Sequence, residues 1–303
     1  MTVGFGLSNR TTMIEFLLLG FSDVQKLQIL HFVVFLVLYL ASLMGNLLII
    51  TAIALDHHLD SPMYFFLVNL SILDLGSISV TIPKSMANSL MNTRFSYSGC
   101  ITQVFLLLFF ASADSALLTI MTVMNRRACV QMVAIAWICS NLYSALNTEN
   151  TFVLTFCGGN VVYQFFCEIL QLFKLTSSDS YLSETGVIVF SVCFALIIVS
   201  YVHIFMTVLR IPSEQGWHKA FCTCLPHLTV VFLFFCTGSF AHLKPTSSSA
   251  SGLDLVVAVL YSVVPPTMNP VIYSMRNKEN KAALRRLTVW KLFTKNNMFV
   301  FLP

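Results

Sequence analysis

The chain has 303 residues, of which 57% are apolar and only 10% are charged, and its mean hydropathy is +0.81. Soluble domains carry about 25% charged residues, so a single soluble domain is excluded, and the apolar content also excludes a disordered chain. A net charge of +4 is too small to indicate a nucleic-acid partner. The composition therefore predicts a protein that crosses a membrane several times and contacts lipid.

The predicted elements are seven membrane-spanning helices. Each is an apolar stretch of about 20 residues, the length that a helix needs to cross a bilayer. The predicted spans are 27–54, 63–82, 100–121, 129–146, 186–209, 220–243 and 253–273. The expected fold class is thus an all-α membrane protein, a seven-transmembrane helix bundle over residues 27–275. Residues 1–26 are expected to be an extracellular N-terminus and residues 276–303 a cytoplasmic tail.

Lysine and arginine residues predict this orientation. With the N-terminus outside, eleven of them fall in cytoplasmic segments and six in outer segments. An excess of basic residues inside is typical of membrane proteins. Asn9 begins the triplet Asn-Arg-Thr, which fits the N-glycosylation pattern and lies outside in this topology.

Motifs in four of the predicted spans carry a family resemblance. They are Gly45-Asn46, PMYFFL at 62–67, LSILD at 70–74, KAFCTCLPHL at 219–228 and PPTMNPVIYSMRN at 265–277. This set resembles the odorant receptors, a branch of the rhodopsin-like G-protein-coupled receptors, over about residues 15–287. The resemblance implies a plasma-membrane receptor, not an enzyme, that binds small hydrophobic odorants. It also implies signalling through a stimulatory olfactory heterotrimeric G protein to adenylate cyclase, with Asn269, Pro270 and Tyr273 in the activation motif.

The inner end of the third span departs from this family. Odorant receptors have MAYDRYVAIC and a PLxY-type segment there, whereas Met121 is followed here by Thr122-Val123-Met124-Asn125-Arg126-Arg127. Roughly fifteen residues are missing, about four helical turns. A short connection still allows the third and fourth spans to pack antiparallel. The departure favours a second interpretation, a receptor-like product that lacks the G-protein switch and does not signal.

The resemblance also implies a disulfide between Cys100, at the outer end of the third span, and Cys167, in the second outer loop. The oxidising extracellular side permits such a bond. Cys157 matches half of a second family disulfide, but its partner position holds no cysteine, so Cys157 is expected to be unpaired.

Two carboxyl groups lie inside predicted spans, at Asp74 and Asp114. A buried carboxylate is costly in a membrane and is usually functional, and two of them facing each other would share a proton or hold a cation. The family places a sodium ion near Asp74, with polar groups that would include Asn46 and Asn269. Both alternatives stay open, and no other cofactor is expected.

A ligand cavity is expected in the outer half of the bundle. Leu107, Leu108, Ala111 and Ser112 recur on one face of the third span. The resemblance places the odorant cavity on this face, together with Phe235, Ser239, His242 and Tyr261. Since Leu107 stands at the level where amine receptors carry an acidic residue, a charged amine is not expected in this cavity.

Two other classes of protein fit less well. A transporter is expected to have several intramembrane charges and broken helices in both halves of the chain, but only the two aspartates fit. An enzyme needs a nucleophile with a nearby base, and the sequence contains no such arrangement.

Overall fold

The computed structural model of the chain describes residues 15–18, 24–55, 62–90, 93–120, 126–153, 161–162 and 264–276, together with single residues between 166 and 263. Four of its helices are long and apolar enough to cross a membrane. They are α1 (Gln25–Leu55), α2 (Pro62–Leu90), α3 (Tyr97–Ile120) and α4 (Arg126–Val153). Of the fifth and sixth predicted spans, only single residues are described.

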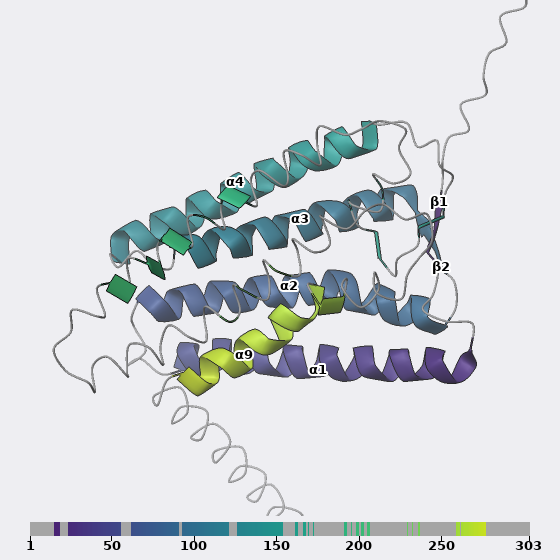
Figure 1. The fold of residues 1–303 in the computed structure, drawn as a ribbon, viewed down its shortest axis with the longest axis horizontal. Coiled ribbons are helices and arrows are strands. Elements are labelled where there is room, and N and C mark those ends of the chain that lie inside the picture. Colours follow the sequence, from purple (N-terminus) through teal and green to yellow (C-terminus); the bar gives the residue numbers. More distant parts are fainter. Residues whose placement is uncertain are drawn as a thin grey trace, which may run out of the picture.

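The four long helices lie side by side in chain order, each packed against the next (Figure 1). The shorter helix α9 (Val264–Arg276) forms part of the seventh predicted span and packs obliquely against α1 and α2. This arrangement agrees with the predicted helix bundle and brings residues from the two ends of the chain together.

Two helices continue more than a full turn beyond the predicted ends of their spans. The span predicted to end at residue 82 continues to Leu90, because α2 runs through Pro83. Neighbouring helices and side chains can satisfy the backbone groups that such a proline frees. The fourth span was predicted to end at residue 146, where the sequence turns polar, but α4 continues to Val153. In both places the apolar stretch ends before the helix does.

Three short strands form a sheet that the sequence did not predict. They are β1 (Glu15–Leu18), β2 (Thr93–Ser96) and β3 (Val161–Val162), in the order β2-β1-β3. β1 pairs antiparallel with β2, with Glu15 opposite Ser96, and parallel with β3. The sheet lies at the end of the bundle where α3 begins (Figure 1). It therefore joins the N-terminal segment to the first and second outer loops.

The buried face of α4 follows the helical period. Its members are Cys129, Val133, Ala136, Ser140, Ser144, Thr148 and Thr151. The spacing of three or four residues places them on one side of the helix, and α4 packs along α3. The four residues nearest the outer end all carry hydroxyl groups, so this part of the helix contact is made of small, polar side chains, as is common between membrane helices.

Two glycines allow close helix contacts. A Cβ atom at Gly76 of α2 would collide with the ring of Phe110 on α3, and one at Gly45 of α1 would lie 2.8 Å from Cβ of Pro270 on α9. In lipid, helices associate through close packing rather than through exclusion of water. Any side chain at these positions would hold the helices apart.

Candidate functional site

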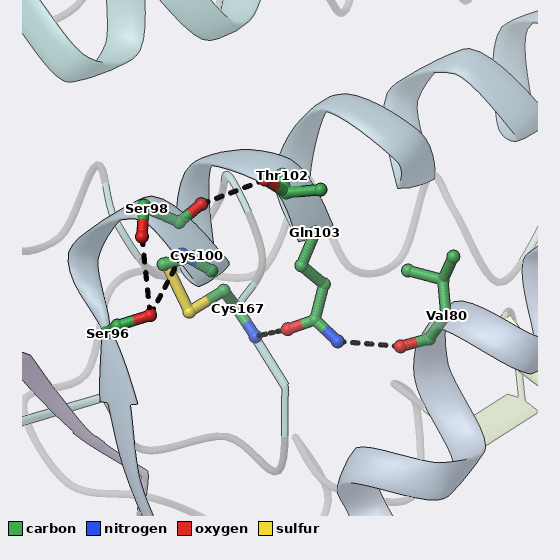
Figure 2. The surroundings of a disulfide bond; sticks show 8 residues. Val80, Ser96, Ser98, Cys100, Thr102, Gln103 and Cys167 are labelled. Atoms are coloured by element: carbon green, nitrogen blue, oxygen red, sulfur yellow. Dashed lines mark hydrogen bonds between the residues drawn. A yellow bond between two sulfur atoms is a disulfide. The ribbon is translucent and has the colours of Figure 1, made fainter.

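A disulfide joins Cys100 of α3 to Cys167 of the loop that follows β3, as the family resemblance implied (Figure 2). Both cysteines are fully buried, and their Cα atoms are 5.5 Å apart, within the usual range. The bond links positions 67 residues apart in the sequence. It fixes the loop over the outer end of the bundle.

Gln103 connects this loop to two helices. Its Oε1 accepts a hydrogen bond of 2.8 Å from the backbone N–H of Cys167, and its Nε2 donates one of 2.8 Å to the carbonyl of Val80 on α2 (Figure 2). The side chain is 4% exposed. Sequence reasoning missed this residue, although a polar side chain one helical turn after Cys100 in an apolar span was a usable signal.

An apolar cluster surrounds the disulfide and continues onto the sheet. Phe16 and Leu18 of β1 are fully buried against it. Tyr97 of α3 stacks on Phe16, lies edge-on to Phe152 of α4, and donates a hydrogen bond of 3.2 Å to the Phe152 carbonyl. The sheet, the loop and the tops of α3 and α4 thus form one packed outer cap, which we define by Phe16, Leu18, Tyr97, Cys100, Phe152 and Cys167.

The predicted cavity residues of α3 have different surroundings in the structure. Leu107 packs with residues of α1 and α2 and with Val263, which directly precedes α9, whereas Leu108 packs in the outer cap. The hydroxyl of Ser112 donates to the Phe109 carbonyl of its own helix, at 3.1 Å, and Ala111 is exposed. The remaining predicted residues lie outside the described part of the chain; they are Phe235, Ser239, His242 and Tyr261, as well as Asn9 and Cys157. The odorant cavity therefore stays a prediction.

The intramembrane polar residues form a network between α2 and α9. Asn269 Nδ2 donates hydrogen bonds of 3.1 and 3.0 Å to the two carboxyl oxygens of Asp74. Both side chains are buried, with Asp74 1% exposed. The carboxyl group of Asp114 on α3 interacts electrostatically with Asp74. Two of the four predicted sodium-site residues are therefore in direct contact, and a third lies near them.

Asn46, the fourth member, bonds instead to the α9 backbone. Its Nδ2 donates to the Pro266 carbonyl at 3.1 Å, and Ser42 Oγ donates to the same carbonyl at 3.0 Å. In a regular helix this carbonyl would accept from the residue four positions later, but that residue is Pro270, which has no N–H. Side chains of α1 thus replace the missing backbone bond. Ser42 was not singled out from the sequence. Tyr273 lies on the same helix, and its side chain is outside the described part.

Several oxygens in this region have no hydrogen-bond donor within the part of the chain that the structure describes. They are Oδ1 of Asn46, Asp114 and Asn269. Oxygen atoms are the ligands that hard cations prefer, and unbonded acceptors are costly in a buried setting unless something satisfies them. The donor set therefore fits a sodium ion.

The inner end of the bundle carries the departure from the family pattern. α3 ends at Ile120 and α4 begins at Arg126, so that Arg126 and Arg127 belong to the fourth helix. The two helices nevertheless pack together. As predicted, the missing segment does not prevent their pairing.

Comparison with known proteins identifies the relatives of this chain. A sequence profile described as "Olfactory receptor" matches residues 35–291. The chain is 48% identical to human olfactory receptor 14A16, over 95% of this chain and all of that protein. It is 47% identical to human olfactory receptor 14J1, over 92% of this chain and 94% of that protein, and 40% identical to rat olfactory receptor 1f45, over 95% and 99%. The alignment with 14A16 spans 310 positions, more than the 303 residues of the chain, so the relative has residues that this chain lacks.

Proposed function

The chain belongs to the olfactory receptor family, multi-pass receptors of the plasma membrane and not enzymes, and on that premise we propose that it binds small apolar odorants in a cavity in the outer half of the bundle. Ligand binding then activates a heterotrimeric G protein of the stimulatory olfactory type, and this activation raises the cAMP concentration. The missing segment after α3 weakens this last step.

The observation that carries the proposal is the intact outer cap. The disulfide, the Gln103 bridge and the sheet hold the outer loops in one arrangement over α3 and α4. Ligand sites of this kind are mostly apolar with a few polar groups. A fixed cap supports such a site, because it reduces the ordering that ligand binding would otherwise require.

A second candidate function rests on the inner end of the bundle. Because α3 ends at Ile120 and α4 starts at Arg126, the acidic–Arg–Tyr motif of the family has no counterpart there. The alternative is a receptor-shaped protein that binds ligand but does not signal.

The test is a cAMP assay with a broad odorant panel, on this chain and on a chain with an AYDRYVAIC-type segment inserted after Met121. A response that is weak in the first and strong in the second supports the proposal. Ligand binding without any cAMP response from this chain supports the alternative. Equal responses would contradict a coupling defect, and silence from both despite normal surface expression would contradict odorant reception.

We include a sodium ion in the proposed function. Asp74, Asp114, Asn46 and Asn269 are the residues that would hold it, and their unbonded oxygens support this choice over a shared proton. A single proton would satisfy one of these oxygens, whereas a cation can be coordinated by several at once. The ion would stabilise the contact between α2 and α9.

A further inference from the structure

A cavity of about 470 Å³ lies between the outer parts of α3 and α4. Its apolar walls include Ile101 and Phe105 of α3 and Ala145 and Phe152 of α4, and its polar members include Thr148 and Glu149. The volume is in the usual range for small-molecule sites. Of the predicted odorant-cavity residues, the four that the structure describes, Leu107, Leu108, Ala111 and Ser112, do not line this cavity, so it is distinct from the odorant face expected on α3.

The cavity opens on the side of α3 that faces away from α2. Gln103 contacts α2, and Ile101 and Phe105 lie two positions before and after it. Two residues correspond to about 200° around an α-helix, so both side chains leave the opposite side of α3. A ligand here would enter sideways, between α3 and α4.

The unbonded hydroxyl group of Thr148 indicates that a ligand in this cavity is polar. Its side chain is 5% exposed, and its Oγ1 has no hydrogen-bond partner within the described part of the chain. Buried hydroxyls in membrane helices normally bond to the carbonyl four residues earlier, as Thr151 does to Asn147 at 2.6 Å and Ser85 does to Thr81 at 2.8 Å. A buried hydroxyl without a partner is unfavourable, and a ligand in the adjoining cavity would supply one.

Glu149 defines the charge of that ligand. It lines the cavity next to Thr148 and is exposed near the outer end of α4, and no ion pair of Glu149 occurs among the described residues. A carboxylate beside an unpaired hydroxyl accepts hydrogen bonds from a cation. Charge-assisted hydrogen bonds of this type are the strong ones.

We propose that the cavity between α3 and α4 binds a small primary amine with a compact apolar body. The ammonium group donates to the Glu149 carboxylate and the Thr148 hydroxyl, and the apolar body fills the space between Phe105 and Phe152. The chain thus has a lateral amine site in addition to its expected odorant cavity, which contains no acidic residue at the level of Leu107.

The experiment uses the full chain in phosphatidylcholine nanodiscs, a lipid without a primary amine. The probe is 2-(4-fluorophenyl)ethylamine, followed by ¹⁹F NMR, and the neutral analogue is 2-(4-fluorophenyl)ethanol. We expect saturable binding of the amine and at least tenfold weaker binding of the alcohol. Glu149→Gln should weaken amine binding at least tenfold and Thr148→Val several-fold. Glu15→Gln, which removes a carboxylate of the sheet, is the matched control and should leave binding unchanged.

Ala145→Phe keeps the test decisive if a polar variant folds poorly. Ala145 is exposed, so a ring at this position closes the cavity without disturbing the core. Loss of binding with an unchanged melting temperature would support the site. No saturable binding, equal binding of the alcohol, or unchanged binding in Glu149→Gln and Ala145→Phe would overturn it. Displacement of the probe by phosphatidylethanolamine in the nanodisc would identify a lipid headgroup as the occupant and would also overturn it.

Discussion

At the scale of single residues, Gln103 joins two parts of the chain that lie far apart in the sequence. One amide side chain bonds the loop at Cys167 and the helix α2 at Val80, and both partners are backbone groups in a buried setting. Pro83 lies in the same stretch of α2 and cannot donate to the Ser79 carbonyl, so this part of the helix has one backbone bond fewer. The glutamine therefore adds a link between α2 and the outer cap where α2 is locally weaker.

We predict that Gln103→Leu lowers the melting temperature and the surface expression of the receptor. Leucine keeps the volume but leaves the buried Cys167 N–H without its partner, at about 1–3 kcal/mol for an orphaned group, and it removes the link to the Val80 carbonyl. The measurements are thermal unfolding in detergent and cell-surface labelling. Thr102→Val is the control, because Thr102 is exposed and its hydroxyl donates to the Ser98 carbonyl of its own helix. Equal losses in both variants would argue against a specific bridge.

The sodium proposal is also tested at one residue. Asp74→Asn removes the charge that a cation needs but retains one oxygen that can accept from Asn269. We expect the melting temperature of the parent chain to rise with sodium chloride relative to choline chloride. This difference should disappear in Asp74→Asn and shrink in Asp114→Asn. A parent protein that is insensitive to sodium would remove the cation and leave the shared proton as the explanation.

The helices associate through the close fit of their side chains, and the contact at Gly76 is the clearest case. The ring of Phe110 on α3 occupies the space where a Cβ atom at Gly76 of α2 would lie. The same ring is partly buried against the cluster that includes Leu73, Leu117 and Val133. The spacing of α2 and α3 thus depends on the absence of one side chain.

We predict that Gly76→Ala destabilises the bundle by about 1–3 kcal/mol, the usual cost of overpacking. Phe110→Leu gives the helices more room and should restore most of the loss in the double variant. The double-mutant cycle, measured by thermal unfolding in detergent, reports the coupling between the two positions. Strictly additive effects would contradict the close contact.

The helices, unlike the strands, could be predicted from the sequence. The long apolar stretches of the sequence locate α1 to α4, because a helix that crosses a bilayer needs about 20 apolar residues. They miss the last turns of α2 and α4, where Lys84 and Glu149 break the apolar run but not the helix. The strands were missed because they have two to four residues each and pair across long sequence separations. Such pairing depends on tertiary contacts rather than on local preference.

The residues of the candidate site also fall into two groups, those that could be predicted from the sequence and those that could not. The disulfide and the Asp74–Asn269 contact involve residues whose chemistry is conspicuous in an apolar chain. Gln103 and Ser42 act through backbone carbonyls, and no sequence pattern reveals which carbonyl a side chain will reach. The bond from Ser42 to Pro266 is explained by Pro270 only after α1 and α9 are known to touch.

At the scale of the whole molecule, the outer and inner ends of the bundle differ. The outer end is tied by a disulfide, a sheet and the Gln103 bridge. At the inner end, α3 and α4 are joined by residues 121–125 alone. A receptor signals only if ligand at one end and G protein at the other favour the same state. The coupling free energy between two sites is reciprocal, so a defect in signalling must also be visible in ligand binding.

We therefore predict that G protein raises the affinity of this chain for an odorant much less than it does in a chain with the missing segment restored. In a chain with the AYDRYVAIC-type segment restored after Met121, nucleotide-free stimulatory G protein should raise agonist affinity at least about fivefold, the lower end of typical couplings. Addition of GTPγS should reverse this gain. In the chain as it stands, G protein should change agonist affinity by less than about twofold, because the third-helix arginine that distinguishes the active state is absent. The measurement is equilibrium binding of an odorant found in the panel, to both chains in the same nanodiscs. A nucleotide-sensitive gain of equal size in the unrestored chain would show that Arg126, Arg127 or another group replaces the missing switch.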